Sequence, residues 1–357
     1  MEETFAYRLI SARKMEGLSL QGLADRLGNV VTKQSLGKYE QGKMKPGSEM
    51  IINLANALNV PVDYFFANPS VKVELVDIDY RKFKTKLSNI ELEAIEEKAK
   101  DIFERYFEIE NIINLEEKND YFEYKPVIST PEDAENAAKE LREQWNLGYD
   151  PVPDVAKMLE DKGYRVVEID APEGFDGLKA NSVNRKVIVL RKSNADDDIV
   201  RKRFTALHEL AHHSLKFKDG ILQSEEERLC HAFASAILYP ADMAKRDLHK
   251  DRFHFYQNEL QLIKERWGIS FSAIFSRSLR LGIINDYIFK KLMIGYNKRK
   301  FNIPNNEPGR FLSKEKPVRF ESLIYLALGK ELISINEAAY YLGTSVWKFR
   351  EQSHLML

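Results

Sequence analysis

The chain has 357 residues, a length typical of two or three domains, and its 44% hydrophobic content is enough to bury several cores and to exclude a disordered protein. A net charge of −1 gives the whole chain no bias toward nucleic acid, membrane surfaces or acidic partners. A single cysteine, Cys230, excludes an internal disulfide framework, and no apolar run approaches the roughly 20 residues of a membrane span. The acidic N-terminus lacks the apolar stretch of a signal peptide, so we expect a soluble cytoplasmic protein.

Residues 1–68 predict a domain of five short helices. Apolar residues recur at helical spacing in short pieces that turn residues separate, with helices expected at 5–15, 20–27, 33–40, 48–58 and 61–66. Ser19 and Thr32 are predicted N-caps, and Gly28 is a predicted helix end. A helix, a short turn and a second helix with a polar outer face are typical of a helix-turn-helix unit.

The helix expected over residues 33–40 carries the polar face of this unit. Leu36 is expected to face the core, and Lys33, Gln34 and Lys38 to face outward. Glutamine can form paired hydrogen bonds to adenine in a major groove, and lysine can reach guanine or phosphate. The predicted DNA-binding residues are therefore Lys33, Gln34 and Lys38, with Ser19, Gln21, Lys43 and Lys45 as phosphate contacts.

Three stretches of this segment carry a known pattern: L-S-L-Q-G-L-A-D-R-L-G, V-T-K-Q-S-L-G-K-Y-E-Q-G-K-M-K-P-G and L-A-N-A-L-N-V-P-V-D-Y-F-F. With them, the segment resembles the Xre/Cro/CI family of phage-repressor-type DNA-binding domains. The resemblance implies binding to a DNA operator, usually as a homodimer. Gly37, on the expected recognition helix, and Gly22 depart from the family pattern.

The charge of this segment leaves an alternative open. Residues 1–66 contain eight Lys and Arg residues and seven Asp and Glu residues, which gives a net charge of +1. That is a weak electrostatic footprint for DNA, although lysines cluster on the third helix and the following turn. The alternative is a small helical module that binds protein.

Residues 69–125 predict a helical connector. An extended piece is expected at 71–79 and a long helix at 87–115, where Ser88 and Glu91 form a capping box. The helix has a broad apolar face. This face either forms the seam of a homodimer or packs against a neighbouring domain, and the sequence leaves both readings open.

An H-E-x-x-H motif, His208 to His212, dominates residues 126–246. Residues four apart share a helix face, so His208 and His212 can direct imidazole nitrogens at one Zn²⁺ ion with bonds of about 2.0–2.1 Å. Glu209 lies on an adjacent face, where it can take a proton from a water molecule that the metal activates. Around the motif we expect helices at 131–145, 153–162, 201–217 and 224–238, and strands at 164–169, 177–180 and 186–190.

The helix expected at 224–238 is predicted to supply the third metal ligand. Glu225, Glu226 and Glu227 are all candidates, and Glu227 lies three residues before Cys230 on the buried side, whereas the other two point more toward solvent. His231 either supports the metal-bound carboxylate or bonds to backbone, and Cys230 is interpreted as an apolar filler. The strand at 187–190 could hold a substrate by strand addition if it lies at a sheet edge.

Two further patterns, R-x-R-F-T-x-x-H-E-x-x-H-x-x-L and E-x-x-x-H-x-F-A-x-x-x-L-x-P, end at Leu215 and Pro240. With them, residues 126–246 resemble the ImmA/IrrE-type zinc metallopeptidases. The resemblance implies a Zn²⁺ cofactor held by His208, His212 and Glu227, with Glu209 as the base. Ala211 stands where glycine is frequent in the family, and Tyr239 where methionine is frequent.

Residues 247–357 predict a helical region, with helices at 255–267, 270–281, 287–296 and 319–328 and a linker at 302–316. A weak second helix-turn-helix pattern at 334–350 is interpreted as a packing module or lid. The expected fold class is mainly α with an α+β zincin-like peptidase domain. We expect a DNA-binding transcriptional regulator that cleaves a repressor, an antitoxin or another transcription factor. The alternatives are a non-enzymatic regulator or antitoxin with a structural or sensory metal site, and, more weakly, self-cleavage.

Overall fold

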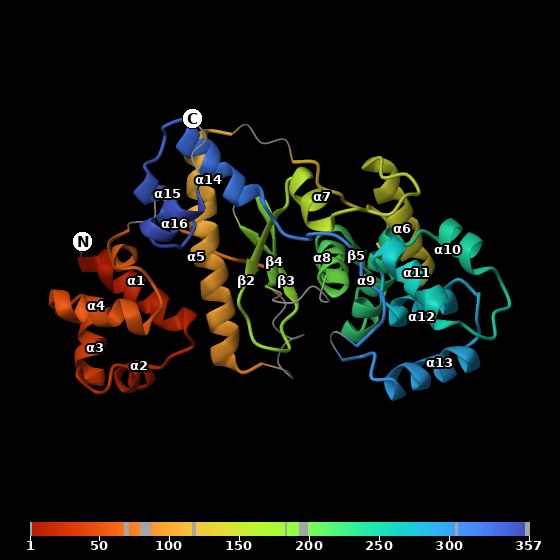
Figure 1. Cartoon of the computed structure of the whole chain (residues 1–357), viewed down its shortest axis with the longest axis horizontal. Coiled ribbons are helices and arrows are strands. Elements are labelled where there is room, and N and C mark those ends of the chain that lie inside the picture. The colour runs from red at the N-terminus through yellow and green to blue at the C-terminus, as the bar shows by residue number, and fades with distance from the viewer. Residues whose placement is uncertain are drawn as a thin grey trace.

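The computed structural model describes residues 2–67, 71–78, 87–115, 119–182, 184–192, 199–303 and 306–353. The fold is mainly helical with two small sheets, which confirms the predicted fold class. The helix-turn-helix domain lies at one end of the molecule and α10–α13 at the other, with the larger sheet between them (Figure 1). Within the described residues, no helix combines the length and the apolar character that crossing a bilayer requires.

The N-terminal domain contains α1 (Glu2–Met15), α2 (Leu20–Arg26), α3 (Lys33–Glu40), α4 (Ser48–Ala57) and the 3₁₀ turn η1 (Val62–Phe66). The predicted fifth α-helix is therefore a 3₁₀ turn, which Pro61 introduces in an extended conformation. The predicted caps are present: Ser19 Oγ accepts from Gly22 N at 3.0 Å and Thr32 Oγ1 accepts from Ser35 N at 3.1 Å. The helices enclose an apolar core that includes fully buried Leu9, Leu23, Leu36, Leu54 and Phe65.

The long helix α5 (Asn89–Ile113) joins the two halves of the molecule. The Arg8 guanidinium of α1 is fully buried, and it forms ion pairs with Asp101 at 3.3 Å and with Glu104 at 3.1 Å. It also donates a hydrogen bond to Tyr340 Oη at 2.8 Å. The apolar face of α5 packs in one core with the larger sheet and α14. The chain itself covers this face, so the reading of α5 as a dimer seam is wrong and the packing alternative is confirmed.

The larger sheet contains β2 (Arg165–Ile169), β3 (Gly177–Ser182) and β4 (Arg185–Arg191). Its order is β2-β4-β3, with β2 parallel and β3 antiparallel to β4. Because β4 is the central strand, its backbone is already paired on both sides, and substrate binding by strand addition at 187–190 is excluded. Both β2 and β3 are edge strands, and the extended segment 71–78 meets β3 through a bridge between Val76 and Asn181.

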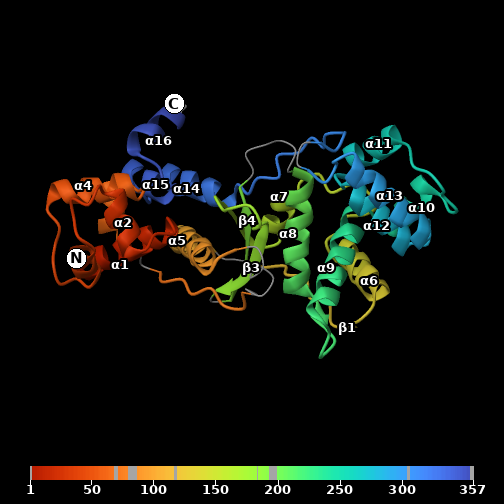
Figure 2. The same ribbon diagram turned by 90° about the horizontal axis from the view of Figure 1, so that it is seen from below.

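One face of this sheet packs on α5, and the opposite face packs on α7 (Val155–Asp161) and α8 (Ile199–Ser214) (Figure 2). Next to α8 lies α9 (Gln223–Leu238), and α6 (Pro131–Gln144) packs against α9. The helix expected to reach residue 217 ends at Ser214, because Lys216–Phe217 form β5, which pairs in parallel with β1 (Val127–Ile128). Strands of two residues carry no periodic signal, and the sequence reading missed both.

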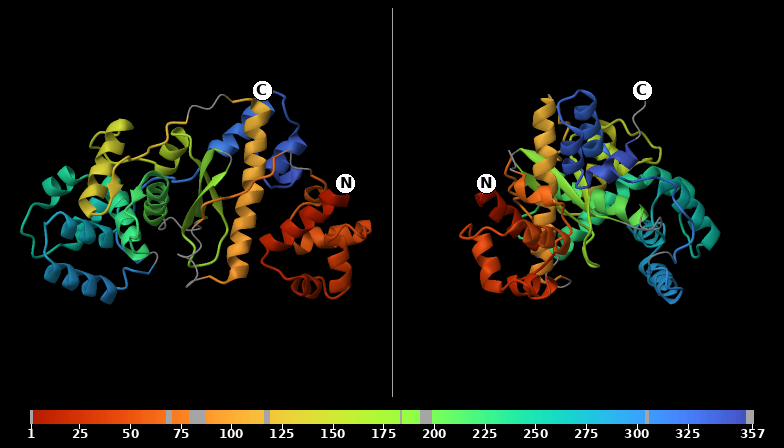
Figure 3. Two further views of the ribbon diagram at one scale, coloured as in Figure 1. Left: turned by 180° about the vertical axis from the view of Figure 1, so that it is seen from behind. Right: turned by 60° about the vertical axis from the view of Figure 1, so that its left-hand side comes forward.

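Beyond α9, the helices α10 (Ala241–Leu248), α11 (Gln257–Trp267), α12 (Phe271–Arg280) and α13 (Asp286–Lys298) form a separate core. The chain then crosses back over α8 to α14 (Arg319–Gly329), α15 (Ile335–Tyr341) and α16 (Val346–Gln352), which lie beside α5 (Figure 3). The crossing is fixed by a buried ion pair of 2.9 Å between Arg203 Nη1 and Glu315 Oε1. Ala338 and Ala339 of α15 are buried in this core, so the pair α15–α16 packs against the rest of the chain.

Candidate metal centre and DNA-binding surface

The H-E-x-x-H motif occupies the last two turns of α8. Apolar residues on the other faces of the helix, among them Leu207, Leu210 and Ala211, are fully buried against the sheet and α9. As a result the polar residues of the motif are also enclosed: His208 is 7% exposed and Glu209 is 2% exposed. Buried polar groups need partners, and the neighbouring helix α9 supplies them.

The structure brings His208, His212 and Glu227 together. The Nε2 atoms of the two histidines lie 3.2 Å apart. Glu227 Oε2 lies 3.0 Å from His208 Nε2, and Glu227 Oε1 lies 3.4 Å from His212 Nε2. Two imidazole nitrogens of α8 and the two carboxylate oxygens of Glu227 on α9 therefore lie close together.

These distances fit a tetrahedral zinc site. Two ligand atoms that each lie about 2.1 Å from a tetrahedral centre are roughly 3.4 Å apart. The two imidazole nitrogens are 3.2 Å apart and lie 3.0 and 3.4 Å from one or the other Glu227 oxygen, and all three separations are close to that value. Burial acts to raise the pKa of Glu227, but hydrogen bonds from His208 and His212 hold the pKa of this carboxyl far below its usual value. An ionised carboxylate between two imidazoles is a suitable donor set for a divalent metal.

Glu226 and Cys230 surround the other nitrogen of His212. Glu226 Oε1 lies 3.3 Å from His212 Nδ1, and Cys230 Sγ lies 3.7 Å from the same atom. Burial acts to lower the pKa of His212, but its contacts with Cys230, Glu226 and Glu227 raise this pKa to about 12. The expectation that Glu226 points toward solvent is therefore wrong. A signal was available, because Glu226 lies four residues before buried Cys230 and so shares its helix face.

Two other histidines differ in where they point. His231 is exposed, with its ring 4.7 Å from that of His208, and it offers a nitrogen within 4.8 Å of the donor atoms of His208 and Glu227. His213 lies on the opposite side of α8, with Nε2 3.0 Å from the backbone oxygen of Val187. Burial lowers the pKa of His213 to about 3, so it is a neutral structural residue.

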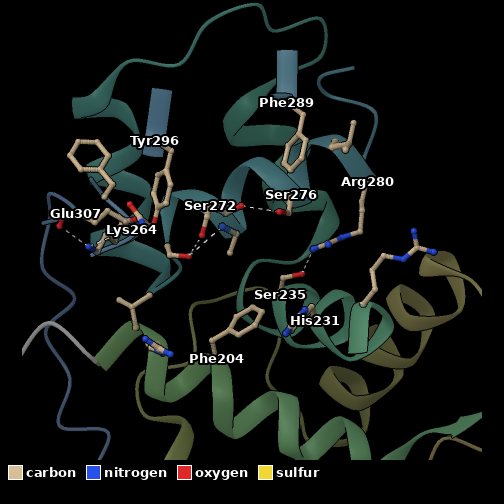
Figure 4. A pocket seen from close by; sticks show the side chains of 18 of the residues that line it. Phe204, His231, Ser235, Lys264, Ser272, Ser276, Arg280, Phe289, Tyr296 and Glu307 are labelled. Carbon is tan, nitrogen blue, oxygen red and sulfur yellow. Dashed lines mark hydrogen bonds and ion pairs between the residues drawn. The ribbon is translucent and has the colours of Figure 1, made fainter. Parts of the chain in front are cut away.

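A pocket of about 670 Å³ adjoins the metal centre (Figure 4). Phe204 of α8 and His231 and Ser235 of α9 form the wall nearest to the motif. The opposite walls come from α11, α12, α13 and the following loop, and they include Lys264, Ser272, Ser276, Arg280, Phe289, Tyr296 and Glu307. The sequence reading missed this pocket, since its lining is spread over residues 131–307 and no local pattern marks it.

All the residues predicted to contact DNA are exposed. Lys33, Gln34 and Lys38 lie on the outer face of α3, while Leu36 is fully buried beneath them. Ser19, Gln21, Lys43 and Lys45 are also exposed, although Gln21 Nε2 donates to Asp25 Oδ1 at 2.9 Å. Figure 1 shows α3 at one end of the molecule and α8 and α9 beyond the larger sheet, so the two groups of residues do not form one site.

Comparisons with known families agree with both parts. A helix-turn-helix family model matches residues 9–65, and a model described as an IrrE N-terminal-like domain, of a metallopeptidase type, matches residues 159–278. The second match continues beyond residue 246 into α12 and ends at Ser278, two residues before Arg280 of the pocket lining.

Similar proteins include three HTH-type transcriptional regulators that are themselves uncharacterized. The SPbeta prophage-derived regulator YonR of Bacillus subtilis is 36% identical over 74 residues, which cover 21% of this chain and 67% of YonR. The regulator YqaE of Bacillus subtilis is 35% identical over 66 residues, 18% of this chain and 55% of YqaE. A regulator of Sinorhizobium medicae is 39% identical over 59 residues, 16% of this chain and 41% of that protein. For the last two, the chain spans only about half of the relative's length.

Proposed function

Because the chain belongs to the Xre-type helix-turn-helix transcriptional regulators and carries an ImmA/IrrE-like domain, we propose that it is also a zinc-dependent endopeptidase that cleaves a regulatory protein. Candidate substrates are a repressor, an antitoxin or another transcription factor. The observation that supports the proposal most directly is the convergence of His208, His212 and Glu227 at 3.0–3.4 Å.

His208, His212 and Glu227 would hold the zinc ion and leave one position open, the arrangement of catalytic rather than structural zinc sites. When bound, zinc lowers the pKa of water toward 7 and polarises a carbonyl oxygen. Glu226 orients His212 through its Nδ1 atom at 3.3 Å, as neighbours of metal ligands commonly do.

Glu209 is proposed as the general base. It follows His208 directly and is buried beside it, so its carboxylate is largely withdrawn from bulk water. It accepts a proton from the water that attacks the peptide carbonyl, and it then donates this proton to the nitrogen of the leaving amine. His231, exposed next to His208, is placed to support the Glu227 carboxylate or the oxygen of the carbonyl under attack.

The helix-turn-helix domain is proposed to bind an operator through α3. Docking of the domain through Arg8 on α1 leaves Lys33, Gln34 and Lys38 exposed for a major groove. Operator binding as a homodimer is part of this proposal, since domains of this kind usually read two half-sites.

The test uses the zinc-loaded protein and its Glu209→Gln variant, each incubated with the regulatory proteins encoded beside its gene. We expect the wild-type protein to cut one of them at a restricted site, and the variant to cut at least about 100-fold more slowly. Equal zinc content in the two proteins is the control. Equal cleavage rates would reject Glu209 as the base.

The same pair of proteins separates the proposal from its alternatives. A structural or sensory metal site predicts bound zinc without proteolysis, and gene regulation that Glu209→Gln leaves unchanged. Self-cleavage predicts fragments of the wild-type chain on a gel and an intact Glu209→Gln chain. Retention of a partner by the Glu209→Gln protein during purification would identify the substrate.

A further inference from the structure

The pocket beside the metal centre shares a wall with it. His231 is exposed to the pocket, while its ring lies 4.7 Å from that of His208 and 5.6 Å from that of Phe204. A peptide bound at His208 would therefore lie next to this wall of the pocket. A volume of about 670 Å³ falls within the range of sites that hold drug-sized ligands, so a short stretch of peptide can enter it.

The side of the pocket nearest to the metal centre is positively charged. Arg280 reaches across it and donates a hydrogen bond to Ser235 Oγ at 2.5 Å (Figure 4). This acceptor is neutral, and among the described residues the buried Nε atom of Arg280 has no hydrogen-bond partner. Burial, and next the neighbouring charge of Arg277, lower the pKa of Arg280 to about 10. The guanidinium stays charged at neutral pH but is poorly compensated.

Of the other cations in the pocket lining, Lys264 and Arg201 form close ion pairs, whereas Arg228 lies 4.0 Å from Glu225 and its 65% exposed side chain is solvated. Lys264 Nζ lies 3.1 Å from Glu307 Oε1, and Arg201 Nη2 lies 2.8 Å from Asp176 Oδ2. Arg277 forms a bidentate ion pair with Glu135 at 2.7 and 2.8 Å, which occupies the carboxylate next to Arg280. Arg280 therefore stands out as the partly buried cation of the pocket whose charge is left for a ligand.

Apart from four serines and Asn302, the remaining uncharged lining is mostly apolar and aromatic. Phe204 lies at the wall next to His231, and Phe289 and Tyr296 of α13 project from the opposite side (Figure 4). A ligand that fits this lining has an anionic group for Arg280 and apolar groups beside it. Carboxylates suit a guanidinium because its planar fork matches their two oxygens.

We propose that this pocket is a specificity subsite, in which Arg280 binds the carboxylate of an Asp or Glu close to the scissile bond of the polypeptide substrate. Apolar neighbours of this acidic residue pack on Phe204 and Phe289. The inference rests on the proposed peptidase function, because the pocket is assigned to the substrate by its shared wall with the metal centre.

The first experiment measures which peptide bonds are cut. The zinc-loaded protein is incubated with a proteome-derived peptide library, and the cut sites are identified by mass spectrometry. We expect Asp or Glu to be enriched at one fixed position near the cut. For a matched pair of peptides with Glu or Gln there, kcat/KM should favour Glu by at least 10-fold, about 1.4 kcal/mol.

Variants of Arg280 then test the assignment. Arg280→Gln should reduce the Glu-to-Gln ratio of kcat/KM to near 1, and Arg280→Lys, which keeps the charge, should preserve most of it. Arg246→Gln removes an exposed cation outside the pocket lining and is the control for total charge. Cleavage without any acidic preference, or a preference that survives Arg280→Gln, would overturn the subsite while leaving the peptidase proposal intact.

A binding experiment keeps the inference testable if no peptide is cut. Fluorescein-labelled hexapeptide mixtures with one fixed Glu or Gln are titrated against the Glu209→Gln protein, with and without Arg280→Gln. Tighter binding of the Glu mixture by at least 10-fold, lost with Arg280→Gln, supports the subsite even if the proposed peptidase activity fails. Equal binding, or no binding, overturns it. Free glutarate that binds more tightly than the Glu mixture would assign the pocket to a small anion and reject a substrate side chain.

Discussion

The helix-turn-helix domain and the α8–α9 region hold their functional side chains in opposite ways. On α3, Lys33, Gln34 and Lys38 are exposed side by side above buried Leu36. Between α8 and α9, His208, His212 and Glu227 are mostly enclosed, and each contacts the other two within 3.4 Å.

This difference determines how each region responds to change. Exposed residues that contact separate groups on a ligand contribute increments that nearly add. Residues that share one ion and one buried space act as a unit, so removing one of them removes most of the effect of all. Substitutions in the two regions test whether the effects are additive on α3 and coupled between α8 and α9.

The largest effect is expected at the metal centre. Replacing His212 with alanine removes one donor side chain of three and leaves Glu227 with His208 as its remaining histidine partner. Since loss of a residue that merely supports a ligand already costs about 10- to 100-fold in metal affinity, we expect a loss above about 100-fold here. Competition with a zinc chelator measures it. Unchanged DNA binding is the control. Adding His208→Ala to His212→Ala should lower the zinc affinity little further. A further loss as large as that of His212→Ala alone would show that the two histidines do not act as a unit.

A second effect concerns Glu315, on the crossing that links the two halves of the chain. Its carboxylate pairs with Arg203 and accepts from the backbone N–H groups of Val155 and Ala156 at 2.9 and 3.2 Å. Burial nevertheless raises the pKa of Glu315 to about 7, with Asp154 adding to the increase.

Because the folded pKa of Glu315 lies above the unfolded value, the folded chain retains a proton that the unfolded chain releases. The stabilising contribution is present below pH 4.5 and is lost as the pH rises to about 7. The loss is at most about 3 kcal/mol. Thermal midpoints from pH 5 to pH 8 should fall more for the wild-type protein than for Glu315→Gln. Parallel curves would show that Glu315 does not titrate in this range.

A smaller effect is expected from Glu226, which contacts His212 Nδ1 at 3.3 Å. Glu226→Gln should weaken zinc binding by about 10- to 100-fold, the range for residues that orient a metal ligand. Its matched control is Glu225→Gln, one residue away, because Glu225 is exposed and lies 4.0 Å from Arg228. Equal zinc affinities of the two variants would show that the helix charge matters and the contact with His212 does not.

The smallest single effects are expected on the DNA-binding surface. Gln34→Ala should reduce the free energy of operator binding by about 1 kcal/mol and relax the sequence preference at one base pair. Lys43→Ala should weaken binding to every sequence alike and reduce the salt slope by about 1. The double variant should show the sum of the two losses, measured by fluorescence anisotropy on operator and unrelated DNA. A strongly non-additive result would mean that these residues share a contact.

The local spacing of residues in the sequence determined many of the helices and several of the predicted site residues of this protein. The caps at Ser19 and Thr32, the helix over 33–40 and the pair His208 and His212 follow from short-range patterns, because one turn of helix fixes which side chains share a face. The same rule placed Glu227 beside the two histidines. Both family assignments were reached from such stretches.

Only the tertiary structure decided what those elements meet. Strand β4 is central because two strands from different parts of the chain pair with it, and α5 is covered because the sheet, α14 and Arg8 all reach it. Arg280 joins Ser235 across a pocket whose lining comes from residues separated by up to 176 positions, from Pro131 to Glu307. A periodic pattern records which face of a helix is apolar, but it holds no information about which distant segment covers that face.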